Sequence, residues 1–424
     1  MSPLRPTALP PLLAGVAALG VCALGFAIRP NLPATRLFVL VHDPLLLALS
    51  LGAAAWVWRH PGCIGMPTVL VLALLMRLLA ASEPPALSSD VYRYAWDGHV
   101  QRAGFSPYAF APGDPQLAPL RDTAIHPHIN RPTAHTVYPP GAQLLFLALP
   151  FHLDAVRGVF ILLDLLTIWL IGRLLRDLGR DPARAVLYAW SPLAVYEVGN
   201  NGHLEAAVLP LLLAAVLARR AGRLRATGLW LGAAASLKLY PLLLALALAP
   251  PRWLRVLGPA LALLAALYLA YGLQVGAGVL GFLPRYMGVA EDHNIGLRAA
   301  LETLLQPVVH QHRREIAFGL CLLAMAAGLL WVARSTAPLE EKVRDLAGVY
   351  LLTVPTALHP WYALWLVPWL CVAPRAAWLW LVATVPLSYL KYATPDGVMP
   401  AWVVPVEFVP TAALLARDLR RRPA

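Results

Sequence analysis

The sequence predicts an all-α polytopic membrane protein, built as a bundle of about 12 to 14 transmembrane or re-entrant helices. Its composition is 59% hydrophobic and 13% charged over 424 residues, with a mean hydropathy of +0.64. These values are typical of membrane proteins and exclude an ordinary soluble domain. The net charge of +12 lies in short loops between apolar runs. It therefore indicates topology, as the positive-inside rule expects, and does not indicate nucleic-acid binding.

The helices are placed by apolar runs that approach the roughly 20 residues needed to cross a bilayer. The first run, about 9–28, lacks a clear cleavage site and is expected to remain as an anchor. A short run at 142–151 suits a re-entrant or interfacial helix. Further helices are expected at about 36–58, 67–82, 155–175, 185–198, 204–218, 256–274, 314–333, 343–358, 361–373, 376–390 and 402–416.

Two long loops separate these helices, at 84–137 and 275–313, within a single transmembrane domain of residues 1–424. With the basic loops assigned to the cytoplasm, both long loops fall on the outer, periplasmic face. Loops of this length in a compact chain are usually functional or disordered. The polar and aromatic content of 84–137 favours function.

The apolar segment 226–251 is interrupted by the residues Lys238-Leu-Tyr-Pro241. As one helix it would place Arg252 and Arg255 outside and invert every later loop. As two short helices meeting at Lys238, it returns the chain inside and keeps the later basic loops inside. We therefore expect a hairpin.

Residues 88–108 form a polar and aromatic run directly behind an apolar helix. The helical spacing of Asp90, Arg93 and Asp97 would place two carboxylates and a guanidinium on one face. Aromatic rings would surround that face, from Tyr92, Tyr94 and Trp96. The stretch is either the rim of an active site or an interfacial aromatic belt with a surface ion pair.

On this topology, polar residues from distant loops converge on the outer face. They are Asp90, Arg93, Asp97, Tyr138, Asn200, Asn201, His203, Glu205, Lys238, Asn294, His359 and Tyr362. Buried charges in membrane proteins tend to mark substrate paths or to pair with each other. A carboxylate can act as a base toward a hydroxyl, and a lysine or arginine can neutralise a phosphate. Such a set suits sugar transfer from a lipid phosphate to an alcohol.

Five short motifs resemble bacterial GT-C fold glycosyltransferases, in particular the polyprenyl-phosphate-mannose-dependent mannosyltransferases and the related family 87 proteins. They are Asp-Val-Tyr-Arg-Tyr-x-Trp-Asp-Gly, Tyr-Pro-Pro, Gly-His-Leu-Glu-Ala, Lys-Leu-Tyr-Pro and His-Pro-Trp-Tyr. The resemblance covers roughly residues 65–375. It implies a GT-C-like bundle in the bacterial inner membrane and an inverting transfer from a polyprenyl-phosphate sugar, with mannose first among the sugars. It also implies Asp90 as the general base, although relatives often carry a second acid where this chain has Ser89.

The remaining roles follow from this resemblance and from residue chemistry. Lys238 and Arg93 are expected to bind the donor phosphate. The acceptor is expected to be a hydroxyl of a glycan, lipid or protein, no cofactor is assigned, and the use of a divalent metal stays open because GT-C members differ in it. The loop histidines His126, His128 and His135 match no metal motif. Substrate contacts are expected from Tyr92, Asp97, Tyr138, Asn201, His203, Glu205, Tyr240, Asn294, His359, Trp361 and Tyr362.

Several of these residues also have structural interpretations. Asp90 could cap a helix, Arg93 and Asp97 could pair only with each other, and Lys238 could reach along the interface. His203 and Glu205 could cap and pair at the top of a helix, and His359, Trp361 and Tyr362 could form an aromatic belt. For the whole chain, the alternatives are a transporter or flippase of a lipid-linked or anionic substrate, or a non-enzymatic assembly subunit.

Overall fold

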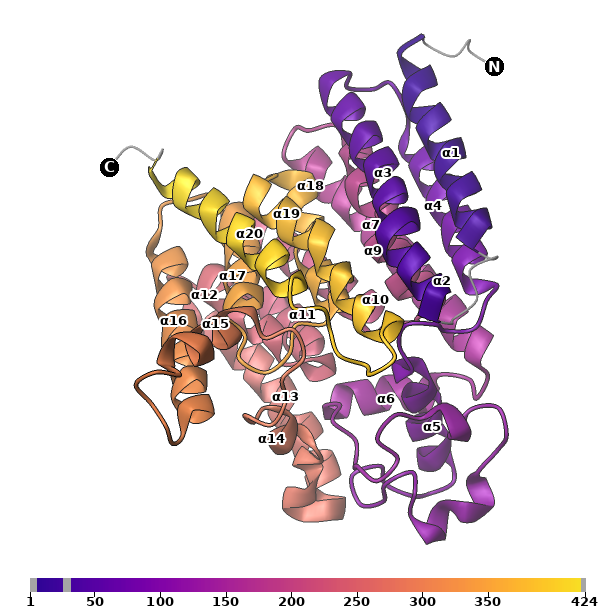
Figure 1. Cartoon of the computed structure of the whole chain (residues 1–424), viewed down its shortest axis with the longest axis vertical. Helices are drawn as coiled ribbons and strands as arrows, with labels where there is room; N and C mark the ends of the chain where they lie inside the picture. Colours follow the sequence, from indigo (N-terminus) through magenta and orange to yellow (C-terminus); the bar gives the residue numbers. More distant parts are fainter. Residues whose placement is uncertain (1–5, 26–31, 421–424) are drawn as a thin grey trace. The chain divides into compact units, whose positions relative to one another are not determined.

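A computed structural model describes residues 6–25 and 32–420 (Figure 1). In these ranges the elements are α, 3-10 and π helices with no strand, which confirms the predicted all-α class. Among the described residues, four helical segments are long and apolar enough to cross a membrane, so the chain is a polytopic membrane protein: Pro33–Arg59, Leu153–Asp177, Trp253–Tyr286 and Arg313–Arg334. Leu9–Gly25 and Met66–Ala81 are shorter apolar helices. Predicted helix positions 26–28, and Arg421 and Arg422, lie outside the described residues.

The chain divides into two compact units. The first unit comprises Met1–Ala80, Ile171–Val195 and Val289–Ala424, and the second comprises Ala81–Leu170 and Tyr196–Gly288. The predicted second outer loop, 275–313, is therefore shared between the units. The prediction of one transmembrane domain over 1–424 stays a prediction.

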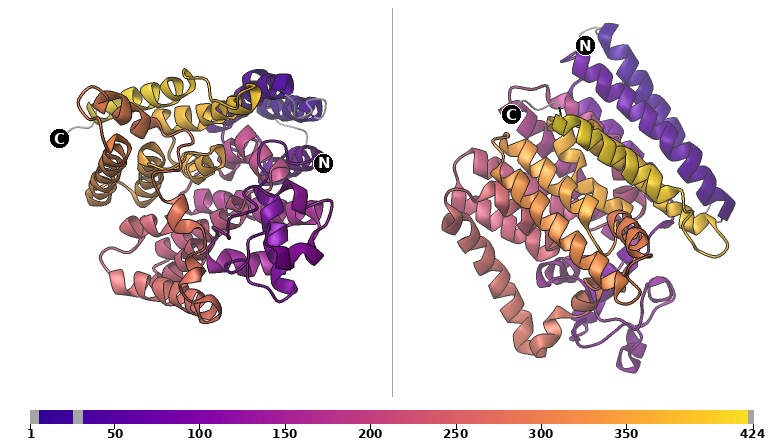
Figure 2. Two further views of the ribbon diagram at one scale, coloured as in Figure 1. Left: turned by 60° about the horizontal axis from the view of Figure 1, so that its bottom comes forward. Right: turned by 60° about the vertical axis from the view of Figure 1, so that its left-hand side comes forward.

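In the first unit, α1 and α3 run side by side (Figures 1 and 2), and α16 packs on α17 as α19 packs on α20. Its helices are α1 (Leu9–Gly25), α2 (Leu32–Leu37), α3 (Asp43–Arg59), α4 (Met66–Ala81), α8 (Val186–Ala189), α9 (Pro192–Ala194), α15 (Gly296–Leu305), α16 (Arg313–Arg334), α17 (Leu339–Thr353), α18 (Val367–Val372), α19 (Ala376–Thr384) and α20 (Val403–Arg420).

The second unit places two short helices of the first outer loop against membrane helices. Its helices are α5 (Asp90–Arg102), α6 (Pro140–Ala148), the start of α7 (Leu153–Asp177), α10 (Glu205–Arg220), α11 (Leu224–Leu237), α12 (Ala245–Leu248), α13 (Trp253–Val275) and α14 (Leu283–Tyr286). α5 and α6 lie together (Figure 1), and a Cβ added at Gly98 would lie 2.0 Å from the carbonyl oxygen of Phe146. At Gly141 a Cβ would lie 2.1 Å from Ser236 Oγ, so α6 approaches α11 equally closely. Glycine is required at both contacts.

The segment after α11 doubles back, which confirms the predicted hairpin. α11 ends at Leu237, and Lys238 is extended with φ −147° and ψ 139°. Arg219, at the end of α10, donates hydrogen bonds to the carbonyls of Leu248 (2.8 Å) and Pro250 (2.9 Å). Because α11 starts just after Arg219, the chain returns at residues 248–250 to the end from which α11 began.

The direction of α13 leads to the same conclusion. The Cβ built at Gly228 meets the backbone of Val256, and the one at Gly232 meets that of Ala260. The two contacts advance together along both helices, so α11 and α13 run parallel. Because α11 and α13 run parallel, the segment that connects them must return along their length.

Several predicted single helices are wrong because prolines divide them. Residues 185–198 form α8, α9 and the π-helical turn η6 (Val195–Asn200), with Pro192 opening α9. The expected helix 343–358 ends at Thr353. The next residue, Val354, precedes Pro355, and a residue before proline disfavours the helical conformation. The expected helices 361–373 and 376–390 each combine an α-helix, α18 or α19, with a 3-10 segment, at η9 (Pro360–Trp365) and η10 (Val385–Ala393).

Candidate active site

Asp90 lies at the first helical position of α5, and Ser89 occupies the N-cap position. Asp90 is therefore not the N-cap of α5, and the capping interpretation was wrong. Its Oδ1 accepts a hydrogen bond from Asn130 Nδ2 at 2.8 Å, across the long loop. Its side chain is 19% exposed. A carboxylate at a helix N-terminus is stabilised by the helix dipole, and partial exposure lets a substrate reach it.

The second oxygen of Asp90 faces a buried histidine. Asp90 Oδ2 lies 3.9 Å from His203 Nδ1, and His203 Nε2 lies 3.3 Å from Glu197 Oε2. His203 is fully buried and Glu197 nearly so. Asn201 Nδ2 donates to the same Glu197 oxygen at 2.9 Å. The order of side chains from the surface inward is thus carboxylate, imidazole, carboxylate and amide.

The turn that carries His203 also fixes the segment leading into α5. Asn200 Oδ1 accepts from the backbone N–H of Ala86 at 3.0 Å, and Asn201 Oδ1 accepts from that of Leu87 at 3.2 Å. Gly202 has φ +64°, and a Cβ there would lie 2.9 Å from a methyl group of Val91. The turn 200–203 therefore sets where α5 begins and so positions Asp90.

Arg93 and Asp97 pair with each other beneath the loop, at 2.7 Å between Nε and Oδ1. Arg93 Nη1 also donates to the carbonyl of Ala134 at 3.1 Å. The other oxygen of Asp97 accepts from Gln143 Nε2 at 3.0 Å. The predicted i,i+4 pair is therefore present, but it is buried and held by groups of the loop and of α6, so the expectation of a surface pair was wrong.

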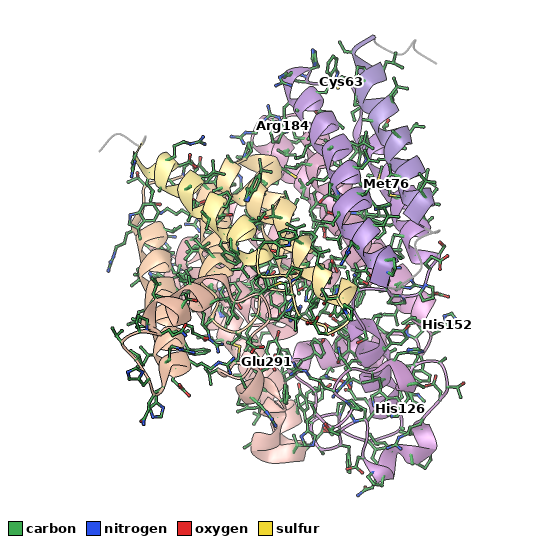
Figure 3. All side chains as sticks on the ribbon, in the orientation of Figure 1. Cys63, Met76, His126, His152, Arg184 and Glu291 are labelled. Atoms are coloured by element: carbon green, nitrogen blue, oxygen red, sulfur yellow. The ribbon has the colours of Figure 1, made fainter. Side chains whose placement is uncertain are left out.

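The aromatic residues of α5 are buried. Tyr94 stacks on Phe146 at 4.7 Å between ring centroids and meets the edge of Tyr138 at 5.1 Å. Trp96 packs near His126, labelled in the loop after α5 in Figure 3, and Tyr92 packs near His128. Trp96 and Tyr94 are thus core residues, whereas Tyr92 lies at the loop.

Lys238 forms an ion pair with Glu205, the first residue of α10. Glu205 is fully buried, whereas the Lys238 side chain is 14% exposed. Burial, and after it the charges of Asp90 and Glu205, raises the pKa of Tyr94 well above its ordinary value. Glu205 follows His203 by two residues, and His203 Nδ1 lies 3.9 Å from Asp90, so the Lys238 pair and Asp90 lie in one region. Tyr240, in the 3-10 turn η7 (Tyr240–Leu244), follows directly.

The remaining predicted residues belong to the first unit. Asn294 has φ +54° and donates from Nδ2 to Glu407 of α20 at 2.7 Å. His359 stacks between Trp361 (4.3 Å) and His293 (4.6 Å). Tyr362 meets the edge of His359 at 5.5 Å. Within that unit, His293, which directly precedes Asn294, thus lies together with His359, Trp361 and Tyr362.

Sequence reasoning missed Glu197 and Asn130 as neighbours of the site. Glu197 is a lone acid near the end of an apolar run, and that is a signal for a buried functional or paired group. Asn130 lies in irregular loop, where no spacing indicates its contact with Asp90. Among the described residues no group of three or more His, Cys, Asp or Glu could hold a metal ion.

The sequence model of glycosyltransferase family 87 matches residues 136–355, just over half of the chain. The chain belongs to glycosyltransferase family 87. It is therefore a membrane glycosyltransferase, as the sequence motifs predicted. Within this family 87 chain, the matched range includes His203, Glu205 and Lys238, whereas Asp90 precedes it. No curated protein and no solved structure matches the chain.

Proposed function

We propose that this family 87 glycosyltransferase moves a sugar, mannose first among the sugars, from a polyprenyl-phosphate donor to an acceptor hydroxyl at the periplasmic face of the bacterial inner membrane. The acceptor oxygen attacks the anomeric carbon while the bond from that carbon to the phosphate oxygen breaks. Polyprenyl phosphate leaves with the electron pair, and the hydroxyl proton passes to Asp90. Attack opposite the leaving group inverts the anomeric centre.

The observation that carries the proposal is the setting of Asp90. It is a partly exposed carboxylate fixed by Asn130 on one side and facing buried polar groups on the other. A base held in this way is within reach of a substrate hydroxyl without being free to rotate away.

Lys238 supplies positive charge in the same region for the departing phosphate. It lies at a helix break, reaches the surface in part and has Glu205 as its resident partner. A donor phosphate would share or replace that carboxylate as the counter-ion. Arg93 already binds Asp97 and the Ala134 carbonyl, so the proposal assigns the phosphate to Lys238 and the support of the loop to Arg93.

The test uses purified protein in detergent with a panel of synthetic polyprenyl-phosphate hexoses and bacterial lipid extract as acceptor. Release of polyprenyl phosphate and the appearance of glycosylated product are both measured. We expect Asp90→Asn to lower turnover about 100-fold or more, as loss of a general base does. Asp114→Asn is the matched control, because an asparagine there still accepts the Gln116 N–H at the cap.

Two results would contradict the proposal. Unchanged turnover in Asp90→Asn would remove the base assignment. Movement of the donor lipid across reconstituted vesicles without release of polyprenyl phosphate would show transport in place of transfer.

A further inference from the structure

We propose that His203 is a positioning residue that takes up the proton from Asp90 during transfer, and that Glu197 orients His203 and supports its charged form. The inference rests on the proposed function, because it assumes that Asp90 is the base. Nothing in the sequence motifs assigns these two residues to proton handling. Their arrangement inside the second unit indicates it.

Glu197 contacts both the backbone and the side chain of His203. Its own backbone N–H donates to the Glu197 carbonyl at 2.9 Å, while Nε2 lies 3.3 Å from the Glu197 carboxylate. Gly202, at φ +64°, lets the turn pack directly on Val91 of α5. Since His203 is fully buried, it cannot itself receive a substrate hydroxyl. Any role in the reaction must therefore act through Asp90.

The hydrogen bond from Asn201 to Glu197 favours one tautomer of His203. Asn201 Nδ2 donates to Glu197 Oε2 at 2.9 Å, so this oxygen acts as an acceptor. In the proposed arrangement, His203 Nε2, which lies 3.3 Å from Glu197 Oε2, carries the proton, and Nδ1 presents its lone pair to Asp90. In this tautomer the neutral ring is set to receive a proton from Asp90 at Nδ1.

Asp90 and Glu197 are charged groups that face the His203 ring. Asp90 comes from α5 at 3.9 Å and Glu197 from η6 at 3.3 Å. The nearby Arg157 of α7 directs its guanidinium to Asp154 and to the Glu83 carbonyl. An imidazolium formed between the two carboxylates would be stabilised by both, in the way that a buried acid stabilises the histidine of a hydrolase triad.

The proton steps then balance. Asp90 removes the proton as the acceptor oxygen bonds to the anomeric carbon and polyprenyl phosphate departs. Asp90 passes the proton to His203 Nδ1 once the two side chains close from 3.9 Å to hydrogen-bond distance. Asp90 is again a carboxylate and Glu197 remains one. The proton returns through Asp90, which is partly exposed, to water or to the departing phosphate.

The experiment compares His203→Gln, Glu197→Gln and Asp90→Asn with His99→Gln in the polyprenyl-phosphate hexose assay. His99 lies on α5 and stacks on Phe151, so its replacement is a matched histidine change outside the site. We expect kcat to fall about 10- to 100-fold in His203→Gln, with the KM for the donor changed little. His99→Gln should retain wild-type kcat.

The pH profile separates proton handling from a structural role. Histidines titrate closer to neutral pH than carboxylic acids do. Loss of the imidazole should therefore move the acidic limb of kcat/KM to lower pH in His203→Gln. Glu197→Gln should move the limb in the same direction, because the imidazolium loses its supporting carboxylate.

The outcomes distinguish this inference from the proposed function. If Asp90→Asn is inactive but His203→Gln keeps the wild-type pH profile or the wild-type kcat, the inference fails and the base assignment stands. If Asp90→Asn retains turnover, the base assignment itself fails. Misfolding is checked by the thermal midpoint of each purified variant, and a destabilised His203→Gln is replaced by His203→Asn, which must show the same shift of the limb.

Discussion

Lys238 and Glu205 form an ion pair that joins the break after α11 to the first turn of α10. Replacing Lys238 alone would therefore have two effects at once. Removing the lysine takes away a phosphate-binding charge, and it also leaves Glu205 buried without its counter-ion, which is costly.

A double variant separates these consequences. We expect Lys238→Met to lose both thermal stability and at least about 100-fold in turnover, because a positioned charge at a developing anion is worth that much. Lys238→Met/Glu205→Gln should regain stability but not turnover. Thermal midpoints and polyprenyl phosphate release measure the two effects. Recovery of turnover in the double variant would mean that Lys238 serves only to neutralise Glu205.

The close approach of α5 to α6 gives a prediction about packing. At Gly98 a Cβ would lie 2.0 Å from a backbone oxygen, which cannot move aside without shifting α6. We expect Gly98→Ala to cost about 1–3 kcal/mol in unfolding free energy and to lower activity by displacing Asp90. The control is Gly158→Ala on α7, where nothing lies within 4 Å. Denaturant titrations that gave both variants equal stability would contradict the prediction.

The doubling back after α11 predicts the side on which Arg255 lies. A cysteine at Arg255 should react with a membrane-impermeant maleimide only from the cytoplasm, and one at Gln116 only from the periplasm. The four native cysteines are buried, so their background labelling should be low. Labelling of Arg255→Cys in intact spheroplasts would place α12 and α13 on the opposite topology.

His293 predicts a pH dependence of stability. Burial, and then Lys391 with its Nζ 3.4 Å from Nδ1, lowers the pKa of His293 to about 3 from 6.5. Between these values the unfolded chain binds a proton that the folded protein does not, so His293 destabilises the fold increasingly as the pH falls from 6.5 toward 3. The thermal midpoint of His293→Gln should therefore drop less than that of the wild type between about pH 7 and about pH 5.

The matched control for this measurement is His152→Gln, at the exposed histidine labelled in Figure 3. It should follow the wild-type curve. Parallel curves for wild type and His293→Gln would contradict the assignment of the slope to His293.

The sequence predicted the helical class and the hairpin at Lys238 because both depend on long stretches of hydropathy and on the charges of many loops. It did not predict the division of 185–198, because an apolar run of the right length conceals the effect of Pro192 on the backbone. Hydropathy indicates that a segment is buried, but not whether the backbone hydrogen bonds of a helix continue through it.

For the site, helical spacing correctly made Arg93 and Asp97 neighbours but left two interpretations open. The deciding groups, Gln143 and the Ala134 carbonyl, are about forty residues away in the sequence. Asn130 reaches Asp90 over a similar separation. Contacts across an irregular loop have no period, so the residues that surround Asp90 could not be read from spacing.

Asn200 and Asn201 accept hydrogen bonds from backbone amides of the segment before Asp90. The next two residues, Gly202 and His203, lie against α5 and the Asp90 carboxylate. Homologous chains that lengthen or shorten the segment 83–89 should consequently carry compensating changes at 197–203. The two stretches would then co-vary as one inherited unit, and a chimera that exchanges only one of them between relatives should fail where an exchange of both succeeds.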